Sequence, residues 1–115
     1  MTAEALSKII TKGMEEKKAS DIIILDLRSV KNSVTDFFVL CSGNSDTQLE
    51  AISDSIEVEV FKAGEKGPWQ REGKSSGQWI LMDYVNVVAH IFLKEKRDYF
   101  GLEELWGDAK ITKIN

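Results

Sequence analysis

The 115-residue sequence has few of the residue types that build disulfide or metal frameworks. It contains one cysteine, Cys41, and one histidine, His90. A single cysteine excludes an internal disulfide and a site with several cysteine ligands, and a single histidine excludes a two-histidine metal centre. Cys41 lies in the apolar run Phe37–Cys41, where we expect a buried and unreactive thiol. We therefore expect a fold held together by its core, in a reducing, cytoplasmic compartment.

Long hydrophobic runs and an excess of positive charge are also lacking. No apolar run approaches the length of a membrane span, and the N-terminal residues lack the order of a secretory signal. The formal net charge is −4 and the sequence pI is about 5.0. A broad electrostatic contact with phosphates is therefore not expected, and a basic protein is the better partner. The mixed-charge segment Lys12–Lys18 is more typical of a solvated helix end than of an RNA-binding patch.

The composition and the apolar spacing predict one globular domain, residues 1–115, with two long helices. Hydrophobic residues make up 43% and charged residues 30% of the chain, with a single proline. Apolar residues recur at helical spacing after a Thr2 cap, which predicts a helix over about 3–17 with Gly13 near its last turn. The capping box Ser45–Gln48 starts a second helix, about 46–62. Ser55–Phe61 also alternates as a strand would, but the cap and the longer period favour the helix and leave Val58 poorly placed.

The remaining segments predict strands, loops and a short C-terminal helix. Strands are expected at Asp21–Leu27, at Val34–Cys41 and in a hairpin within Ser76–Leu93, with Ser42–Asn44 as a loop. The other expected segments are the loop Ala63–Gly77 with a short edge strand near Trp69–Arg71, a helix or turn at Tyr99–Trp106, and a tail at Asp108–Asn115. This order predicts an α+β fold, a mixed-sheet α/β domain with about four main strands.

The hairpin carries apolar side chains on both faces, which raises the question of what covers them. One face is wholly apolar and predicts core: Ile80, Met82, Val87, Ala89, Ile91 and Leu93. The other face is mixed, with large aromatic residues near its ends: Trp79, Leu81, Asn86, Val88, His90 and Phe92. Two interpretations stay open. Either the two helices divide between the faces and bury both, or part of the second face is an exposed docking surface.

The residues that could support catalysis each have a simpler interpretation. His90 lies in mid-strand between apolar neighbours, which is more typical of a hydrogen-bonded core histidine than of a catalyst. The loop Ser42–Ser45 could offer backbone N–H groups to a phosphate, but it lacks the glycine and lysine of a P-loop and fits a helix cap better. Glu57 and Glu59 diverge on a helix rather than converging on a metal. We therefore predict no catalytic residue, metal site or cofactor.

Four segments taken together resemble one protein family over nearly the whole chain. They are DIIILDL, VTDFFVLCSGNS, EGKSSGQWILMDYVNVVAHIF and RDYFGLEELWGDA. Their most specific parts are Thr35-Asp36, the stretch from Gly77 through Trp79 to Asp83, and His90 together with the ending Leu102-Glu103-x-Leu105-Trp106. In this order and spacing they resemble the Iojap-like ribosomal silencing factors (RsfS).

The resemblance implies a fold akin to nucleotidyltransferases without their catalytic carboxylates. It also implies a non-enzymatic translation repressor that binds the large ribosomal subunit through ribosomal protein number fourteen, which is a basic protein. On that site the repressor blocks joining of the small subunit. Family members are also connected with large-subunit assembly, and several form homodimers when free.

Carried over from the family, the partner-binding surface falls on the hairpin. The implied contacts are Trp79, Ile80, Leu81, Asp83 and Tyr84, with Glu72 and Asp36 as further polar or ionic candidates. Two positions depart from the family pattern, because Asn86 replaces a usual aspartate and Gly101 a frequent aromatic. Asn86 removes a negative charge near a basic partner, which would lower the attraction between the two proteins more than their fit.

Two other functions compete with the repressor. A nucleotide-binding, nucleotidyltransferase-like enzyme would use the loop from Ser42 to Asp46, although paired acidic ligands are missing. An assembly scaffold would instead use the second apolar face for homodimerisation.

Overall fold

The computed structural model describes residues 1–68, 70–73, 78–96 and 109–114. In chain order they form α1 (Ala3–Glu16), β1 (Ser20–Asp26), β2 (Phe37–Gly43), α2 (Asp46–Lys62), β3 (Gln70–Glu72), β4 (Trp79–Asp83), β5 (Val87–Leu93), the short 3₁₀-helix η1 (Lys94–Lys96) and β6 (Lys110–Lys113). The helix predicted at Tyr99–Trp106 lies outside the described residues, as do Gly77, Gly101 and the motif Leu102–Trp106.

The strands form one mixed sheet. Their order is β3-β4-β5-β2-β1-β6, and β2 and β5 run parallel while the other neighbouring pairs run antiparallel. The mixed α+β architecture is therefore confirmed. The sheet has six strands: four main ones, the short edge strand β3 that was expected near Trp69–Arg71, and β6, which comes from the segment predicted as a tail. The sequence of β6, KITK, has no alternation of apolar and polar residues that would predict a strand, and all four residues are exposed in the structure.

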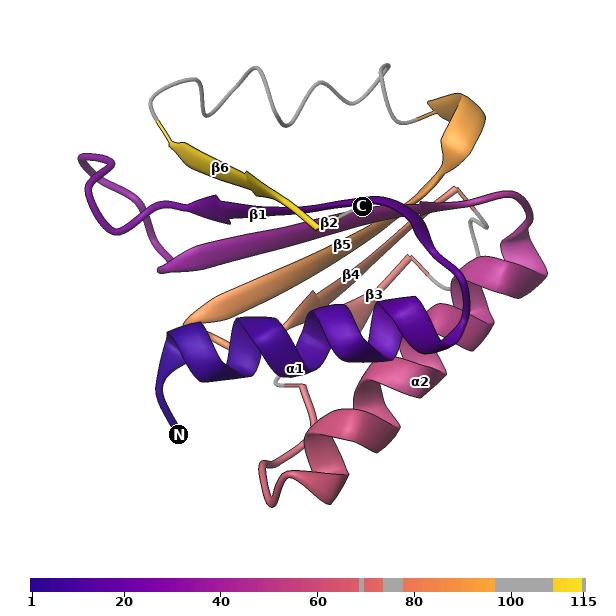
Figure 1. The fold of residues 1–115 in the computed structure, drawn as a ribbon, viewed down its shortest axis with the longest axis horizontal. Coiled ribbons are helices and arrows are strands. Elements are labelled where there is room, and N and C mark those ends of the chain that lie inside the picture. The colour runs from indigo at the N-terminus through magenta and orange to yellow at the C-terminus, as the bar shows by residue number, and fades with distance from the viewer. Residues whose placement is uncertain (69, 74–77, 97–108, 115) are drawn as a thin grey trace.

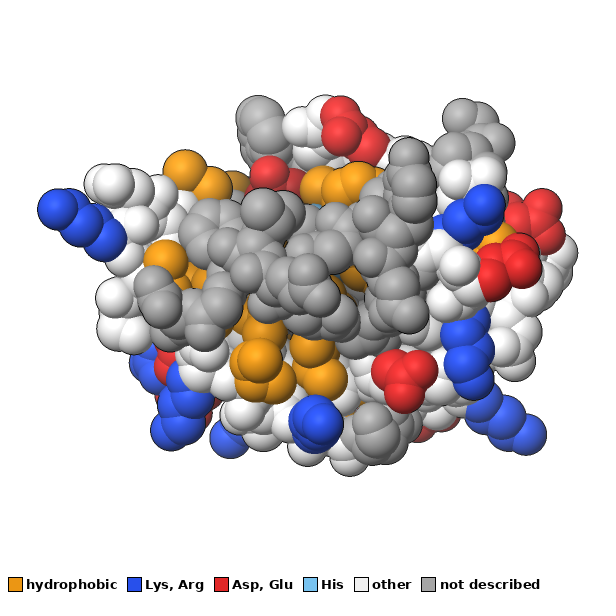
Figure 2. Space-filling view, turned by 90° about the horizontal axis from the view of Figure 1, so that it is seen from above, with side chains coloured by type: hydrophobic (Ala, Val, Ile, Leu, Met, Phe, Trp, Pro, Cys, Tyr) orange, Lys and Arg blue, Asp and Glu red, His pale blue; other side chains and the backbone are white. Residues whose placement is uncertain are grey.

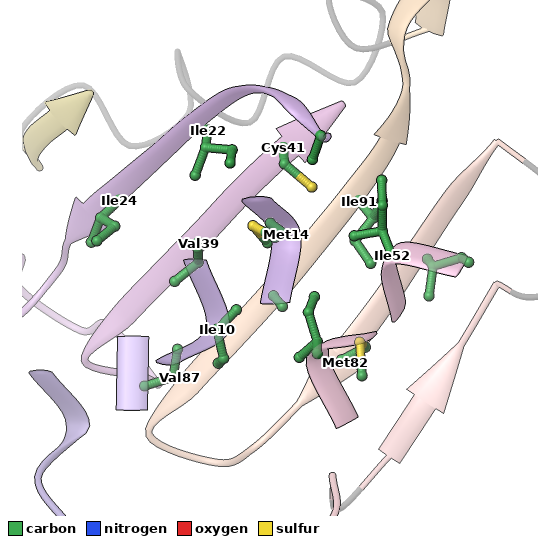
Figure 3. Packing of buried hydrophobic residues seen from close by; sticks show 14 of the residues in the cluster. Ile10, Met14, Ile22, Ile24, Val39, Cys41, Ile52, Met82, Val87 and Ile91 are labelled. Atoms are coloured by element: carbon green, nitrogen blue, oxygen red, sulfur yellow. The ribbon is translucent and has the colours of Figure 1, made fainter. Parts of the chain in front are cut away.

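Both helices lie on the same face of the sheet (Figure 1). They bury one apolar cluster with it, in which Ile10 and Met14 of α1 and Ile52 of α2 meet residues from four strands (Figure 3). The hairpin contributes the predicted core face: Ile80, Met82, Val87, Ala89, Ile91 and the partly buried Leu93. The interpretation in which the helices divide between the two faces is thus wrong.

The helix starts follow the predicted caps. The hydroxyl of Thr2 accepts a hydrogen bond from the Ala5 N–H at 3.1 Å, and the hydroxyl of Ser45 accepts one from the Gln48 N–H at 3.1 Å. These bonds satisfy amides that a helix leaves unpaired in its first turn. Val58 lies half exposed on α2, as expected of a residue off the apolar stripe. The second helix therefore has the predicted bounds.

The bounds of the second strand differ from the prediction at both ends. The strand starts at Phe37, because the preceding Thr35 and Asp36 are bonded to the turn between β4 and β5. Ser42 and Gly43, predicted as loop, continue the strand by pairing with Phe92 and Leu93. Small polar residues predict a loop only when they lack such a partner strand.

The sheet face opposite the helices, called here the outer face, holds a second apolar cluster. Its buried members from the strands are Ile23, Leu25, Phe38, Leu40, Val88 and Phe92, with Trp79 and Leu81 partly buried beside them. Figure 2 looks onto this side of the molecule, where hydrophobic side chains are seen beside the atoms drawn in grey and charged ones lie mostly farther out. No described helix covers this face, and β3 and β4 form one of its edges.

Candidate functional site

Four of the seven predicted contact residues share one part of the outer face. In the antiparallel pairing of β3 with β4, Glu72 lies opposite Leu81. Since alternate residues of a strand share a face, Trp79, Leu81 and Asp83 point to the same side, and Glu72 joins them from the edge strand. We call these residues, Glu72, Trp79, Leu81 and Asp83, the outer-face patch. It combines apolar area with two carboxylates at a sheet edge.

The indole of Trp79 is held in place by the core. Its Nε1–H donates to Nδ1 of His90 at 3.1 Å, and its ring stacks on Phe92 with the centroids 5.4 Å apart. His90 in turn stacks parallel to Phe92 and meets Phe38 edge-on, with centroids 6.0 and 4.6 Å apart. The predicted contact residue Trp79 therefore has a fixed orientation, and a fixed side chain loses little entropy on binding.

His90 is a core residue, as the sequence predicts. It is 3% exposed, and burial lowers its pKa from 6.5 to about 4. The ring is therefore neutral near pH 7, and because Nδ1 accepts from Trp79, its proton lies on Nε2. Nε2 is buried and has no hydrogen-bond partner among the described residues. A neutral imidazole whose acceptor nitrogen is already occupied is a poor general base, so its role here is to orient Trp79.

Gly73 adds a backbone constraint on Trp79 that sequence reasoning missed. Its φ of +90° is one that glycine adopts readily, and a Cβ at this position would lie 1.9 Å from the carbonyl oxygen of Trp79. Any side chain at Gly73 would therefore displace the start of β4. A single glycine after a three-residue strand carries no pattern, so only the structure identifies its role.

Arg71 was also missed, and it connects the edge strand β3 to α2. Its guanidinium donates to the hydroxyl of Ser53 and to the carboxylates of Asp54 and Glu57, at 3.0 and 3.1 Å for the two ion pairs. The residue opposite Arg71 is Met82, which lies in the helix-side core. Arg71 thus projects toward α2 while its neighbour Glu72 projects to the outer face.

Ile80 does not belong to the outer-face patch. It is 1% exposed and packs in the cluster beneath the helices, because its position in β4 alternates with Trp79 and Leu81. Tyr84 is half buried beyond the end of β4 and packs against the same helix-side cluster. Burial, together with the nearby carboxylate of Glu57, raises the pKa of the Tyr84 phenol, which therefore stays protonated.

Asp36 is brought to the β4–β5 turn by backbone bonds. Its N–H donates to the carbonyl of Asn86 at 3.0 Å, as does that of Phe37 at 3.2 Å. Asp83 lies at the start of the same turn, where its carboxylate accepts the Val85 N–H at 2.7 Å. Asn86 contributes its backbone carbonyl here, so an aspartate at this position, as the resemblance implies for the family, would accept the same two bonds. The predicted residues thus divide between the outer-face patch, the turn and the core.

The segments considered for nucleotide chemistry are occupied by structural contacts. The Asn44 N–H donates to Oε1 of Gln48 at 2.7 Å, and the Ser45 hydroxyl caps α2, so both groups already have partners within the protein. The carboxylate of Glu57 pairs with Arg71, while that of Glu59 pairs with Lys12 and Lys62 at 3.4 and 3.3 Å. The two carboxylates thus diverge, as predicted. Within the described ranges, no three His, Cys, Asp or Glu residues lie close enough to hold a metal ion.

Fold and site together define a mixed α/β protein with one helix-covered sheet face and an aromatic, acidic edge on the other. No helix in the described part of the chain is long and apolar enough to cross a membrane. The family model described as "Ribosomal silencing factor during starvation" matches residues 1–115. The chain belongs to this ribosomal silencing factor family, as the resemblance in its sequence indicated.

Individual relatives agree with this assignment. A ribosomal silencing factor of Bacillus subtilis is 36% identical over 115 residues, which cover 100% of this chain and 96% of that protein. A mouse protein named for mitochondrial assembly of the ribosomal large subunit is 30% identical, over 81% of this chain and 41% of its own. A crystal structure of a Chromobacterium violaceum protein has a TM-score of 0.87 at 33% identity, covering 100% of this chain and 94% of that one.

Proposed function

We propose that the protein is a non-enzymatic translation repressor that binds the large ribosomal subunit through ribosomal protein number fourteen. By occupying that site it blocks joining of the small subunit, and it also aids large-subunit assembly. The protein acts in the cytoplasm and forms a homodimer when free. Its fold is akin to nucleotidyltransferases but serves binding rather than catalysis.

The observation that supports this proposal most is the outer-face patch. Its carboxylates, Glu72 and Asp83, flank an apolar surface made by Trp79 and Leu81 at a sheet edge. Aromatic residues are enriched among the anchors of protein interfaces, and carboxylates attract a basic partner. Family membership makes the ribosome the expected partner. The chain's net charge of −4 argues in the same direction, since it disfavours binding through RNA phosphates.

Replacing Trp79 by alanine tests the site directly. We expect Trp79→Ala to weaken binding to purified large ribosomal subunits by roughly 2 kcal/mol, about thirtyfold, because an anchoring aromatic is lost. Co-sedimentation over a range of protein concentrations measures this affinity, and circular dichroism checks that the variant is folded.

The matched control is Phe61→Ala. Phe61 is an exposed aromatic on α2, on the side of the molecule away from the outer face. We expect this variant to bind as the native protein does. If Trp79→Ala binds large subunits with native affinity, the outer-face patch is not the site.

A further inference from the structure

The turn between β4 and β5 contains a residue whose backbone conformation does not suit its side chain. Val85 has a φ of +76°, in the left-handed region that β-branched residues rarely adopt. It is also 59% exposed, so its side chain does not fill the core. A glycine or asparagine would fit this position with less strain. The fold itself therefore gives no reason for a valine here.

The strained conformation is imposed by contacts that do not involve the valine side chain. The Val85 N–H donates to the carboxylate of Asp83 at 2.7 Å, and its carbonyl accepts from the Thr35 hydroxyl at 3.0 Å. On either side, the Tyr84 N–H donates to the carbonyl of Val87 and the Asn86 N–H to that of Tyr84. The turn thus presents an apolar side chain to solvent in a fixed position.

A second exposed valine lies in the neighbouring turn. Val34 is 92% exposed and precedes Thr35, whose hydroxyl makes the bond to Val85. Two carboxylates lie at this end of the sheet: Asp83 forms no ion pair with any described residue, and Asp36 is attracted by Arg28 from beyond ion-pair distance. The turn also borders a hollow of about 470 Å³, which is lined by Tyr84 and Val85, by Leu6 of α1, and by the segment 64–67 after α2 with its opposite charges Glu65 and Lys66. Two exposed valines and two carboxylates thus lie at one end of the sheet, next to a hollow.

We propose that this end of the sheet extends the partner surface beyond the outer-face patch, with Val85 as an apolar contact for a basic protein surface. The proposal rests on the proposed function, because Asp83 belongs both to the patch and to the turn. A basic partner fits best, since the aliphatic stem of a lysine or arginine can pack on Val85 while its charged end approaches Asp83 or Asp36. Strain retained at an exposed position is typical of functional sites.

The decisive variant is Val85→Gly, because it removes the side chain and relieves the backbone strain at once. We expect a melting temperature no lower than that of the native protein, together with roughly five- to tenfold weaker binding to large ribosomal subunits. Val85→Asn, which also tolerates a left-handed backbone, should behave in the same way and guards against a folding defect in either variant. Val58→Ala, at a half-exposed valine on α2, is the control and should bind normally.

The possible outcomes separate this proposal from the proposed function. Native affinity for large subunits in Val85→Gly, while Trp79→Ala loses binding, would overturn the role of the turn and leave the outer-face patch intact. An equal loss of binding in Val58→Ala would also overturn it, since the effect would not be local. Failure of the native protein itself to bind would overturn both proposals. If sedimentation velocity shows that Val85→Gly loses only self-association, the turn contacts a second copy of the chain instead.

Discussion

At the scale of single residues, His90 connects the core to the outer-face patch. Its imidazole is buried between Phe38 and Phe92, and its Nδ1 accepts the indole N–H of Trp79. A neutral histidine here leaves one buried N–H without a partner, whereas a charged one would cost much more, since no described carboxylate pairs with it. The position of Trp79 should therefore depend on the protonation of His90.

This dependence predicts how stability changes with pH. The pKa of His90 is about 4 in the folded protein, below the ordinary value of 6.5, so between these values the unfolded chain binds the extra proton. The contribution of His90 is fully present above about pH 6.5 and is lost as the pH falls toward 4. We expect the free energy of unfolding to fall by roughly 3 kcal/mol over this window from His90 alone.

Urea unfolding at a series of pH values measures this contribution. In His90→Gln the side chain offers an oxygen acceptor to Trp79 but does not titrate. The free energy of unfolding of this variant should therefore decline less between pH 6.5 and 4, and the decline that remains is due to carboxylates. If the free energy of unfolding declines equally with pH in both proteins, His90 does not titrate as a buried group.

At the scale of elements, the packing of α1 on α2 depends on Gly13. A Cβ at Gly13 would lie 2.7 Å from the Cα of Ile56, and the Gly13 carbonyl accepts a hydrogen bond from the Ser55 hydroxyl at 2.8 Å. The two helices therefore approach closely at this point. The sequence suggested only a weak place near the helix end, because spacing along one helix does not show where another helix touches it.

Gly13→Ala should consequently destabilise the protein, although glycine to alanine within a helix is usually stabilising. We expect a loss of about 1–3 kcal/mol in the free energy of unfolding, because the added methyl group forces the helices apart. Chemical denaturation measures the change. Gly67→Ala is the matched control, since a Cβ there meets nothing within 4 Å and should leave stability nearly unchanged. A Gly13→Ala variant as stable as the control would contradict the close packing.

The elements also show how far sequence reasoning reaches. The bounds of α2 were predicted because Ser45 and Gln48 mark its start and the apolar spacing continues from there. The two faces of the hairpin followed from alternation. However, periodicity gives the apolar side of a helix and not the sheet face it covers, so it could not show that α1 and α2 share one face.

For the candidate site, the sequence supplied the residues but not their arrangement. The alternation of side chains along β4 puts Trp79 and Leu81 on one face and Ile80 on the other, although the resemblance had grouped the three together. This alternation could be predicted from the sequence, but the sequence did not show which of the two faces the helices bury. Arg71 and Gly73 act through contacts distant along the chain, with α2 and β4, and no local pattern predicts such contacts.

At the scale of the whole molecule, the arrangement separates stability from the proposed binding. The helices and the face beneath them contain the larger apolar cluster, whereas the outer-face patch lies at the edge of the opposite face. Substitutions in the outer-face patch should therefore alter binding more than folding. Substitutions between the helices should do the reverse.

The rate of subunit joining in the presence of the purified protein tests the central claim most directly. Light scattering follows the association of separated large and small subunits after mixing. We predict that the native protein sediments only with large subunits and slows joining as its concentration rises, and that Trp79→Ala slows joining far less. Joining at the normal rate with large subunits saturated by the native protein would contradict the account.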